Sequence, residues 1–490
     1  MGFSRRWFIG GVAACSAEQA LKAFALPHGT AAVGGLRLRV GILSDIHVRS
    51  DAKWGQDHPQ MAPSDTGCFI KALRYFRSRG VDAVALPGDM ADDGITDQLL
   101  CVGRAWDEVF PEGKVERIFA LGNHDWESWG GGKFRASLFP DGNELARHVL
   151  RDHLRETWNA AFHEDFRRTY VKMVKGYRFG VAHWPFHCDC QDFVRQLAAK
   201  SDPALPFFYL QHPHLKNTVY GPWAWGQDNG LPGSVLSAYP NAVAISGHSH
   251  YALTDERAIW QGGFTAVNAG SLKWTQSPDG LENTGGMGSD LKQMPPVDHD
   301  WSAQALVLSA YDDRLVFERV DFGMPGICES LGPDWVVPLP SAESRPFAFA
   351  SRAAKAAAPV FPEGATVEVS APFDGKTRGG KSSRQVRVSF PQALSASSKR
   401  GRAIVYCVEA LQTGGDLVDE PVLKRFVQAH GFNKSDEHVW PKGRPSVECV
   451  IAVSALPAGA DIRFRAFAIE SFGKRSLPIL SACAVKSNVL

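Results

Sequence analysis

The chain has 490 residues and a nearly balanced charge, with 53 Lys and Arg against 52 Asp and Glu. This length is sufficient for two or three domains, and the lack of a basic stripe gives no indication of a nucleic-acid partner. No apolar stretch reaches the roughly 18 residues of a membrane-spanning helix, and nine scattered cysteines are too few for a disulfide-scaffold protein.

The chain begins with a short polar lead and a pair of arginines, Arg5-Arg6, followed by an apolar run rich in Gly and Ala. This segment resembles a twin-arginine export signal. We therefore predict a signal over residues 1–25, cleaved after Ala25, and an exported protein of the periplasm or cell envelope. The alternative is a lipoprotein box that ends at Cys15, in which case a lipid would attach the chain to a membrane.

Strand-like and helical patterns alternate in the first half of the chain. Apolar residues recur at helical spacing over 69–76 and 99–110, between short runs that read as buried strands. This order predicts a largely parallel sheet. Later segments read as strands with little helix between them, including hairpins over 170–181 and 305–320. The pattern predicts an α/β fold with two facing sheets flanked by helices, a four-layer αββα sandwich.

Five polar clusters each end an apolar run that reads as a strand. In α/β sheets, ligands bind outside the carboxyl ends of the strands, so we expect these clusters to meet at one site. Oxygen and imidazole donors suit hard or borderline divalent metals. The predicted metal ligands are Asp45, His47, Asp89, Asn123, His212, His248 and His250.

The spacing of these residues indicates how they would bind two ions. Two dications roughly 3.5–4 Å apart need an anion between them, and Asp89, which follows the second strand, is the natural bridge. Asp45 and His47 are two residues apart, as are His248 and His250, so on an extended backbone each pair points to one side. A metal-bound hydroxide would act as the nucleophile on a phosphoester.

His124 is surplus to this ligand count. It is followed by Asp125, whose carboxylate we expect to hold it as the acid that protonates the leaving alkoxide, so both are predicted catalytic residues. His212 and His214 both offer a ligand. We prefer His212 because it directly ends an apolar run, and we expect His214 at the rim or behind the ligands.

Together these motifs resemble the calcineurin-like metallophosphoesterase family over about residues 38–320. The resemblance implies the four-layer fold, for which we predict a domain of residues 36–325, and two divalent ions drawn from Mn, Fe, Zn, Mg or Ni. It implies His124 as general acid. It implies one ion on Asp45, His47, Asp89 and His250, and the other on Asp89, Asn123, His212 and His248. The purple acid phosphatase branch has a metal-binding Tyr where this chain has Asp92, so a coloured iron–tyrosinate site is not expected.

The last part of the chain has a different pattern. Residues 338–362 are rich in Ala, Ser and Pro and read as a linker. Residues 363–490 contain alternating strand runs and no cluster of ligand-type or nucleophilic side chains, which predicts an all-β sandwich that adds no chemistry. The run at 462–468 and the turn-rich segment after it resemble an immunoglobulin-like fibronectin type III domain.

These features predict an exported hydrolase that cleaves a phosphomonoester or phosphodiester of a small molecule, a lipid or a sugar. The alternative is an inactive metal-binding or adhesion protein that acts through its β-sandwich, and the intact ligand set favours the enzyme. Long loops at the predicted site either contact the substrate or fill small cores of their own. Their tryptophans are Trp126, Trp129, Trp158, Trp223 and Trp225, and a further loop covers residues 280–296.

Overall fold

The structure is a computed structural model. It describes residues 35–48, 66–92, 94, 96–130, 154–221, 227–275, 302–323, 328–376, 380–393, 402–413, 420–434 and 446–487. The predicted signal with Cys15, the loop 280–296, Trp223, Trp225 and the side chain of Trp129 lie outside this part of the chain. Within the described ranges, no helix has the length and apolar character needed to cross a membrane.

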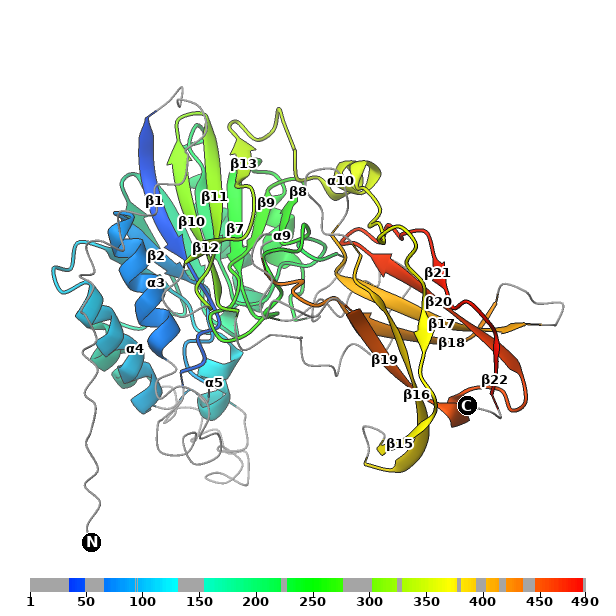
Figure 1. The fold of residues 1–490 in the computed structure, drawn as a ribbon. Helices are drawn as coiled ribbons and strands as arrows, with labels where there is room; N and C mark the ends of the chain where they lie inside the picture. Colours follow the sequence, from blue (N-terminus) through cyan, green and yellow to red (C-terminus); the bar gives the residue numbers. More distant parts are fainter. Residues whose placement is uncertain are drawn as a thin grey trace, which may run out of the picture. The chain divides into compact units, whose positions relative to one another are not determined.

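The first sheet has seven strands and combines parallel with antiparallel pairing (Figure 1). Its order is β12-β11-β10-β1-β2-β3, with β13 pairing to β11. Strands β1, β2 and β3 are parallel, whereas β10 is antiparallel to both β1 and β11. The strands are β1 Leu36–Ile42, β2 Ala83–Leu86, β3 Glu116–Phe119, β10 Gln304–Tyr311, β11 Arg314–Asp321, β12 Glu329–Ser330 and β13 Trp335–Pro338.

The second sheet has six strands in the order β4-β5-β6-β7-β9-β8. Strands β5, β6, β7 and β9 are parallel, whereas β4 and β8 form antiparallel edges. The strands are β4 Thr169–Val174, β5 Tyr177–Ala182, β6 Phe207–Leu210, β7 Ala242–Ser246, β8 Ile259–Gln261 and β9 Thr265–Asn268.

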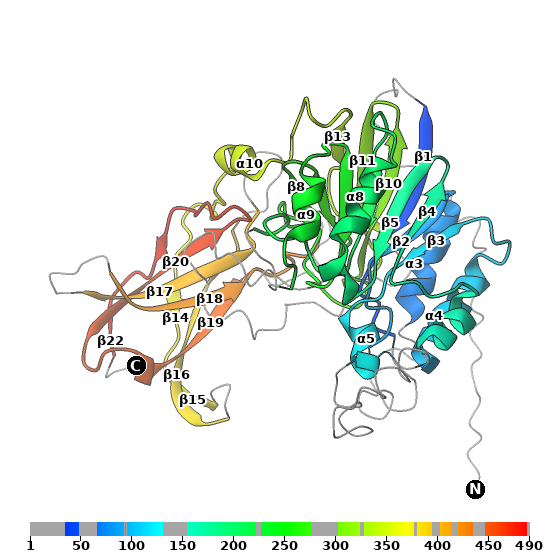
Figure 2. The same cartoon turned by 180° about the vertical axis from the view of Figure 1, so that it is seen from behind.

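The expectation of little helix between the later strands is wrong for the second sheet. Helix α8 (Gln191–Ala199) connects β5 to β6, and α9 (Leu231–Leu236) connects β6 to β7 (Figure 2). Parallel neighbours need such crossovers. The buried face of α8 contains Val194, Leu197 and Ala198. That is helical spacing, but it extends over too few residues to stand out in the sequence.

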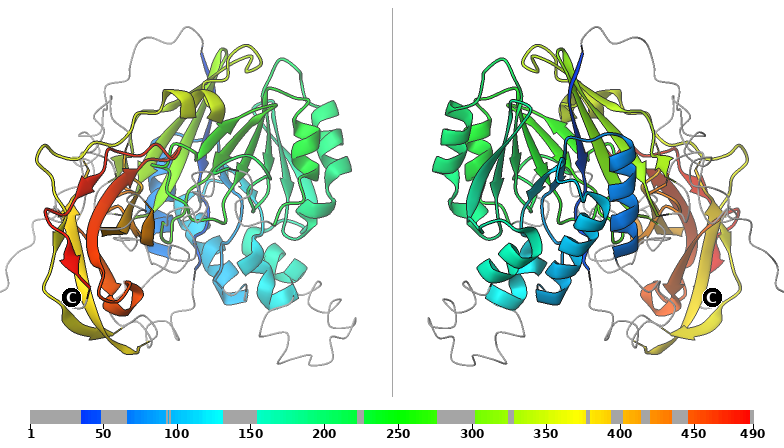
Figure 3. Two further views of the ribbon diagram at one scale, coloured as in Figure 1. Left: turned by 90° about the vertical axis from the view of Figure 1, so that its right-hand side faces the viewer. Right: turned by 90° about the vertical axis from the view of Figure 1, so that its left-hand side faces the viewer.

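The layers form because successive apolar side chains of a strand point to opposite faces of its sheet. In β2, Ala83 and Ala85 belong to the core between the two sheets, whereas Val84 and Leu86 belong to the core under the helices. Helices α3 (Thr66–Ser78) and α4 (Thr96–Val109) supply the other side of this second core. Figure 3 shows the two sheets edge-on with helices outside each. The predicted α/β sandwich is confirmed.

Short helices complete the N-terminal region and the segment after it. Helix α5 (Asn123–Gly130) begins at the end of β3, within one of the polar clusters. In residues 338–362, read as a linker, the structure has helix α10 (Phe349–Lys355). This helix is alanine-rich, and alanine has the highest helix propensity.

The C-terminal region consists of two antiparallel sheets. One has the order β14-β16-β15 with β19 on β16, and the other has β18-β17-β20-β21 with β22 on β20. Val388 of the first sheet and Val408 and Phe464 of the second lie in one hydrophobic cluster, so the sheets share a core. The strands are β14 Glu368–Val369, β15 Phe373–Lys376, β16 Ser382–Pro391, β17 Val405–Thr413, β18 Pro421–Gln428, β19 Ser446–Ala452, β20 Asp461–Ile469, β21 Ile479–Leu480 and β22 Val485–Lys486.

Candidate metal centre

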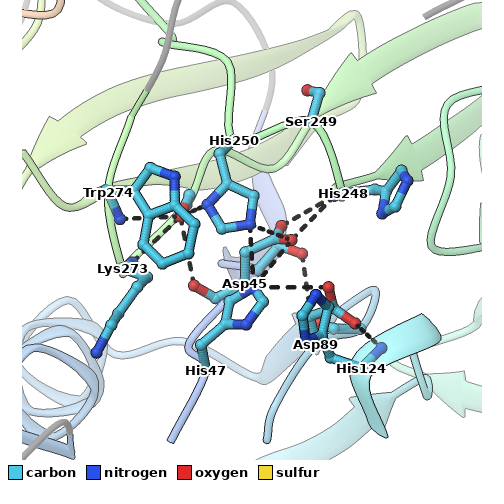
Figure 4. A network of polar contacts seen from close by, with 12 residues as sticks. Asp45, His47, Asp89, His124, His248, Ser249, His250, Lys273 and Trp274 are labelled. Carbon is cyan, nitrogen blue, oxygen red and sulfur yellow. Dashed lines mark hydrogen bonds and ion pairs between the residues drawn. The ribbon is translucent and has the colours of Figure 1, made fainter. Parts of the chain in front are cut away.

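All seven predicted ligands come together at the carboxyl ends of the strands. One group consists of Asp45, His47, Asp89 and His250, whose ligand atoms all lie within 4.8 Å of one another. Figure 4 shows these four side chains facing each other. Asp89 also belongs to a second group with His212 and His248, so it occupies the position that a bridging ligand requires.

The contacts within these groups join atoms that carry lone pairs. The Nε2 atoms of His47 and His250 are 3.0 Å apart, and Nε2 of His250 is 3.2 Å from Oδ1 of Asp45. Nε2 of His212 is 3.1 Å from Oδ2 of Asp89 and 3.1 Å from Oδ1 of Asn123. Buried, converging carboxylate, amide and imidazole donors are what a divalent cation binds, so these residues fit two such ions.

The charges of the site keep its carboxylates ionised. Burial alone would raise the pKa of Asp45, but the charge and hydrogen bond of His250 and the charge of His212 hold this pKa below its usual range. At Asp89, burial is likewise outweighed by His212, and the pKa is lowered. Burial lowers the pKa of His212, yet the charge and hydrogen bond of Asp89 raise it to about 9. Both carboxylates are therefore in the form that binds metal.

The backbone is left-handed at five of the seven ligands, and the expectation of an extended backbone at the two pairs is wrong. The ligand pairs lie in turns that follow β1 and β7, so they converge through these turns and not through the pleat of a strand. Such φ values are uncommon for residues with a Cβ. The angles are 53° at Asp45, 48° at His47, 53° at Asp89, 74° at His248 and 54° at His250.

Two glycines allow the motif loops to approach the ligands. A Cβ built on Gly122 would overlap the carboxylate and backbone nitrogen of Asp89. A Cβ built on Gly247 would overlap the hydroxyl of Ser44 and lie 2.5 Å from Oδ2 of Asp45. The glycines of these motifs thus provide room for the ligand carboxylates.

The structure distinguishes His212 from His214. Nδ1 of His214 is 2.7 Å from the hydroxyl of Ser246, and its Nε2 is 2.6 Å from that of Ser249. Burial lowers the pKa of His214 to about 3, so this ring is neutral. His214 therefore lies behind the ligand groups, whereas His212 is a member of one, as preferred from the sequence.

The two predicted catalytic residues have different surroundings. Nδ1 of His124 is 2.7 Å from the carbonyl oxygen of Asp92, and its backbone N–H donates to Oδ1 of Asp89 at 2.9 Å. The buried carboxylate of Asp125 accepts backbone N–H groups from Ala91 at 2.7 Å and Gly122 at 2.8 Å. Asp125 thus joins the loops after β2 and β3. Its predicted action on His124 stays a prediction.

Sequence reasoning missed several residues beside the ligands. Oδ1 of Asp92 lies 3.1 Å from Nδ1 of His47, within hydrogen-bond distance. Asp92 also forms a group of possible metal ligands with His47 and His124. The sequence gives only one signal for Asp92, namely a carboxylate three residues after Asp89 at the position where purple acid phosphatases have a tyrosine. The hydroxyl of Ser271 lies 3.1 Å from Nδ1 of His250 and carries no recognisable motif.

Among the described residues, a tryptophan that the sequence did not single out lies against the ligands. The Trp274 ring is 4.4 Å from that of His250 and 5.3 Å from that of His47. Trp158, by contrast, is 3% exposed and packs on Phe162, so it fills a core. Trp126 packs at 5.5 Å on the ring of Phe186.

A family model matches the part of the chain that contains these ligands. Residues 38–252 match the model of the calcineurin-like phosphoesterase family. A comparison with curated protein sequences finds no match.

Solved structures give distant likenesses. A dimetal phosphatase from Danio rerio has 13% identity and a TM-score of 0.34, with 62% of this chain and 99% of that chain covered. A purple acid phosphatase from yellow lupin (Lupinus luteus) has 14% identity and a TM-score of 0.40, with 63% and 55% covered. Vacuolar Protein Sorting 29 from Cryptosporidium parvum has 11% identity and a TM-score of 0.29, with 61% and 99% covered. The matched residues 38–252 include all seven ligand-type residues, and the chain therefore contains a calcineurin-like phosphoesterase domain.

Proposed function

We propose that the protein is an exported phosphoesterase that uses two divalent ions to hydrolyse a phosphomonoester or phosphodiester. The observation that carries this proposal is the set of seven converging ligands, six of them buried and Asn123 partly buried, in which Asp89 belongs to both groups. When bound, the two ions supply Lewis-acid activation of the phosphoryl group and a water acidic enough to deprotonate near neutral pH.

Side chains of the protein would screen the charge of the ions and supply a proton to the leaving group. Asp89, ionised and buried, would screen the repulsion between two dications. His124 is partly buried and stands beside the ligands, and we propose that it donates a proton to the leaving oxygen. Its Nδ1 contact with the Asp92 carbonyl fixes the position of the ring beside the ligands.

The alternative is a protein that binds metal but catalyses nothing and acts through its C-terminal sheets. The complete ligand set argues against it, because an inactive descendant would be free to lose ligands. Elemental analysis should find two divalent ions per chain. Chelation should abolish hydrolysis of an aryl phosphomonoester, an aryl phosphodiester or a cyclic nucleotide, and added Mn²⁺ should restore it. Two bound ions with no hydrolysis of any of the three esters would favour the alternative.

Export and the identity of the C-terminal region belong to the same proposal. The Arg5-Arg6 lead supports a twin-arginine route, and its replacement by Lys-Lys should retain the protein in the cytoplasm. Unaffected export would contradict that route, and intact-mass analysis would distinguish cleavage after Ala25 from a lipid on Cys15. For residues 363–490, the two antiparallel sheets with a common core support a fibronectin type III-like sandwich.

A further inference from the structure

A buried turn of the C-terminal region packs against the phosphoesterase domain. This docking turn, residues 431–434, follows β18, and its Asn433 and Lys434 are 0% and 1% exposed. Asparagine and lysine are rarely buried so completely unless their polar groups have partners. The side-chain nitrogens of both residues have such partners in the N-terminal domain.

The docking turn is held by side-chain bonds at several points. Nδ2 of Asn433 donates to the hydroxyl of Thr275 at 2.7 Å, and the carbonyl of Asn433 accepts from Nε2 of Gln304 at 2.5 Å. Nζ of Lys434 pairs with Oδ2 of Asp321 at 2.8 Å. The contacts of Asn433 thus reach two segments, one that contains Thr275 and one that contains Gln304. The first of these segments begins at Ser271, beside the ligand His250.

Residues 271–275, the metal-site loop, connect the docking turn to His250. At one end, the hydroxyl of Ser271 lies 3.1 Å from Nδ1 of His250, and the carbonyl of Ser271 accepts from the backbone N–H of Gln304 at 2.6 Å. At the other end is Thr275, which Asn433 contacts. Between them, Trp274 lies against the His250 ring, as Figure 4 shows.

Asn433 therefore holds both ends of the metal-site loop. Its side chain holds the Thr275 end directly, and its carbonyl holds the Gln304 side chain, whose own backbone bonds to Ser271. Partners that orient the non-ligating nitrogen of a histidine fix its ring for metal binding. Here the orienting hydroxyl is on a loop that the C-terminal region fastens.

We propose that Asn433 is a positioning residue of the metal centre and that the C-terminal sheets serve the enzyme by fastening the metal-site loop. This rests on the proposed function in one respect, namely that His250 is a ligand. It goes further than the expectation that the C-terminal region adds no chemistry, because the region would supply no ligand but would orient one.

The test is a matched set of threonine variants of the full-length chain, with Mn²⁺ binding measured by calorimetry. Thr275→Val removes the hydroxyl that Asn433 contacts, whereas Thr275→Ser keeps it. Thr254→Val is the control, because the Thr254 hydroxyl donates to the carbonyl of Phe432 beside Asn433. No hydrogen bond among the described residues joins this hydroxyl to residues 271–275. All three changes are small, so the fold should persist.

We expect Thr275→Val to weaken binding of one of the two ions about tenfold, the lower end of what the loss of an orienting partner causes. Thr275→Ser and Thr254→Val should bind both ions as the unmodified chain does. Combining Thr275→Val with Asn433→Ala should weaken binding no further than the larger single effect, because both changes break one link.

Three results would overturn the proposal. Unchanged affinity in Thr275→Val would show that the docking turn does not orient the site. An equal loss in Thr254→Val would show general loosening of the fold. Additive effects of the two changes would show that Asn433 and Thr275 act separately. Failure of the unmodified chain to bind Mn²⁺ would instead remove the proposed function, and this proposal with it.

Discussion

At the scale of single residues, the ligands occupy backbone conformations that cost free energy. Each non-glycine residue in the left-handed region costs roughly 1–3 kcal/mol unless its surroundings impose it. Hydrogen bonds between loops do so here: the backbone N–H of His47 donates to the Asp89 carbonyl at 3.1 Å, and that of Asp45 donates to Gly88 at 3.1 Å. The loops after β1 and β2 therefore hold each other's ligands in place.

The role of His124 can be tested with two substrates. His124→Ala should lower turnover of a phosphoester with a poor leaving group by about 10²–10⁴, the usual contribution of general acid catalysis. The loss should be much smaller for a nitrophenyl ester, whose leaving group needs no proton. Steady-state kinetics with both esters would check this, with metal content as the control. Equal losses on the two esters would contradict an acid role.

A buried histidine behind the site predicts a pH dependence of stability. His183 is 0% exposed, its Nδ1 accepts the backbone N–H of Leu121 at 2.8 Å, and burial lowers its pKa to about 3. The unfolded chain has a histidine pKa of about 6.5 and so binds more protons below that pH. Stability is thus intact above about pH 6.5 and is lost as the pH falls toward the folded-state pKa.

His183→Asn should reduce this slope, because Asn keeps an acceptor for the Leu121 N–H but does not titrate. Between about pH 6 and pH 4, the free energy of unfolding should fall by about 1.4 kcal/mol less per pH unit than in the unmodified chain. Urea unfolding at several pH values measures both slopes. Parallel slopes for the two proteins would show that His183 is already protonated when folded.

At the scale of elements, close approach of the loops depends on glycine. Gly122→Ala would force its Cβ into Asp89, so we expect loss of metal and of nearly all hydrolysis. Gly233→Ala is the matched control: it lies in α9, and its nearest neighbour would be Leu215 at 3.6 Å, an ordinary contact. Metal content and circular dichroism would check both variants. Full metal occupancy in Gly122→Ala would show that the loop has room to move.

The elements also show what a sequence can and cannot predict. Strand β20 (Asp461–Ile469) contains the run 462–468 that the sequence marks as a strand, because apolar and polar side chains alternate along it. Strand β18 was missed, since Leu423, Arg425 and Phe426 are only partly buried at the edge of a sheet and show no such alternation. Residue types at strand ends predicted which side chains would meet at the site. They could not predict Ser271 or Asn433, whose roles depend on contacts far apart in sequence.

At the scale of the whole molecule, one buried ion pair joins the C-terminal region to the first sheet. Lys434 and Asp321 are 1% and 3% exposed, whereas the pair of Arg37 with Asp312 is 60% and 46% exposed. Removal of one partner from a buried pair leaves an uncompensated charge and costs about 3–5 kcal/mol. An exposed pair contributes about 0–1 kcal/mol.

Lys434→Met should therefore lower the free energy of unfolding by about 3–5 kcal/mol, and Arg37→Met should lower it by less than about 1 kcal/mol. Urea unfolding of both variants at one pH measures the difference. Two variants of equal stability would mean that water reaches Asp321 in solution and compensates its charge.

The docking turn has a consequence for how the protein is made. During synthesis, the ligands from Asp45 to His250 leave the ribosome first. Asn433, which we propose fastens the metal-site loop, follows much later. Strand β1 must also wait for β10, its antiparallel neighbour. A nascent chain that stops before the turn thus carries every ligand in a loosely held arrangement. On the proposal above, firm binding of metal would therefore follow only after residue 433 has been synthesised.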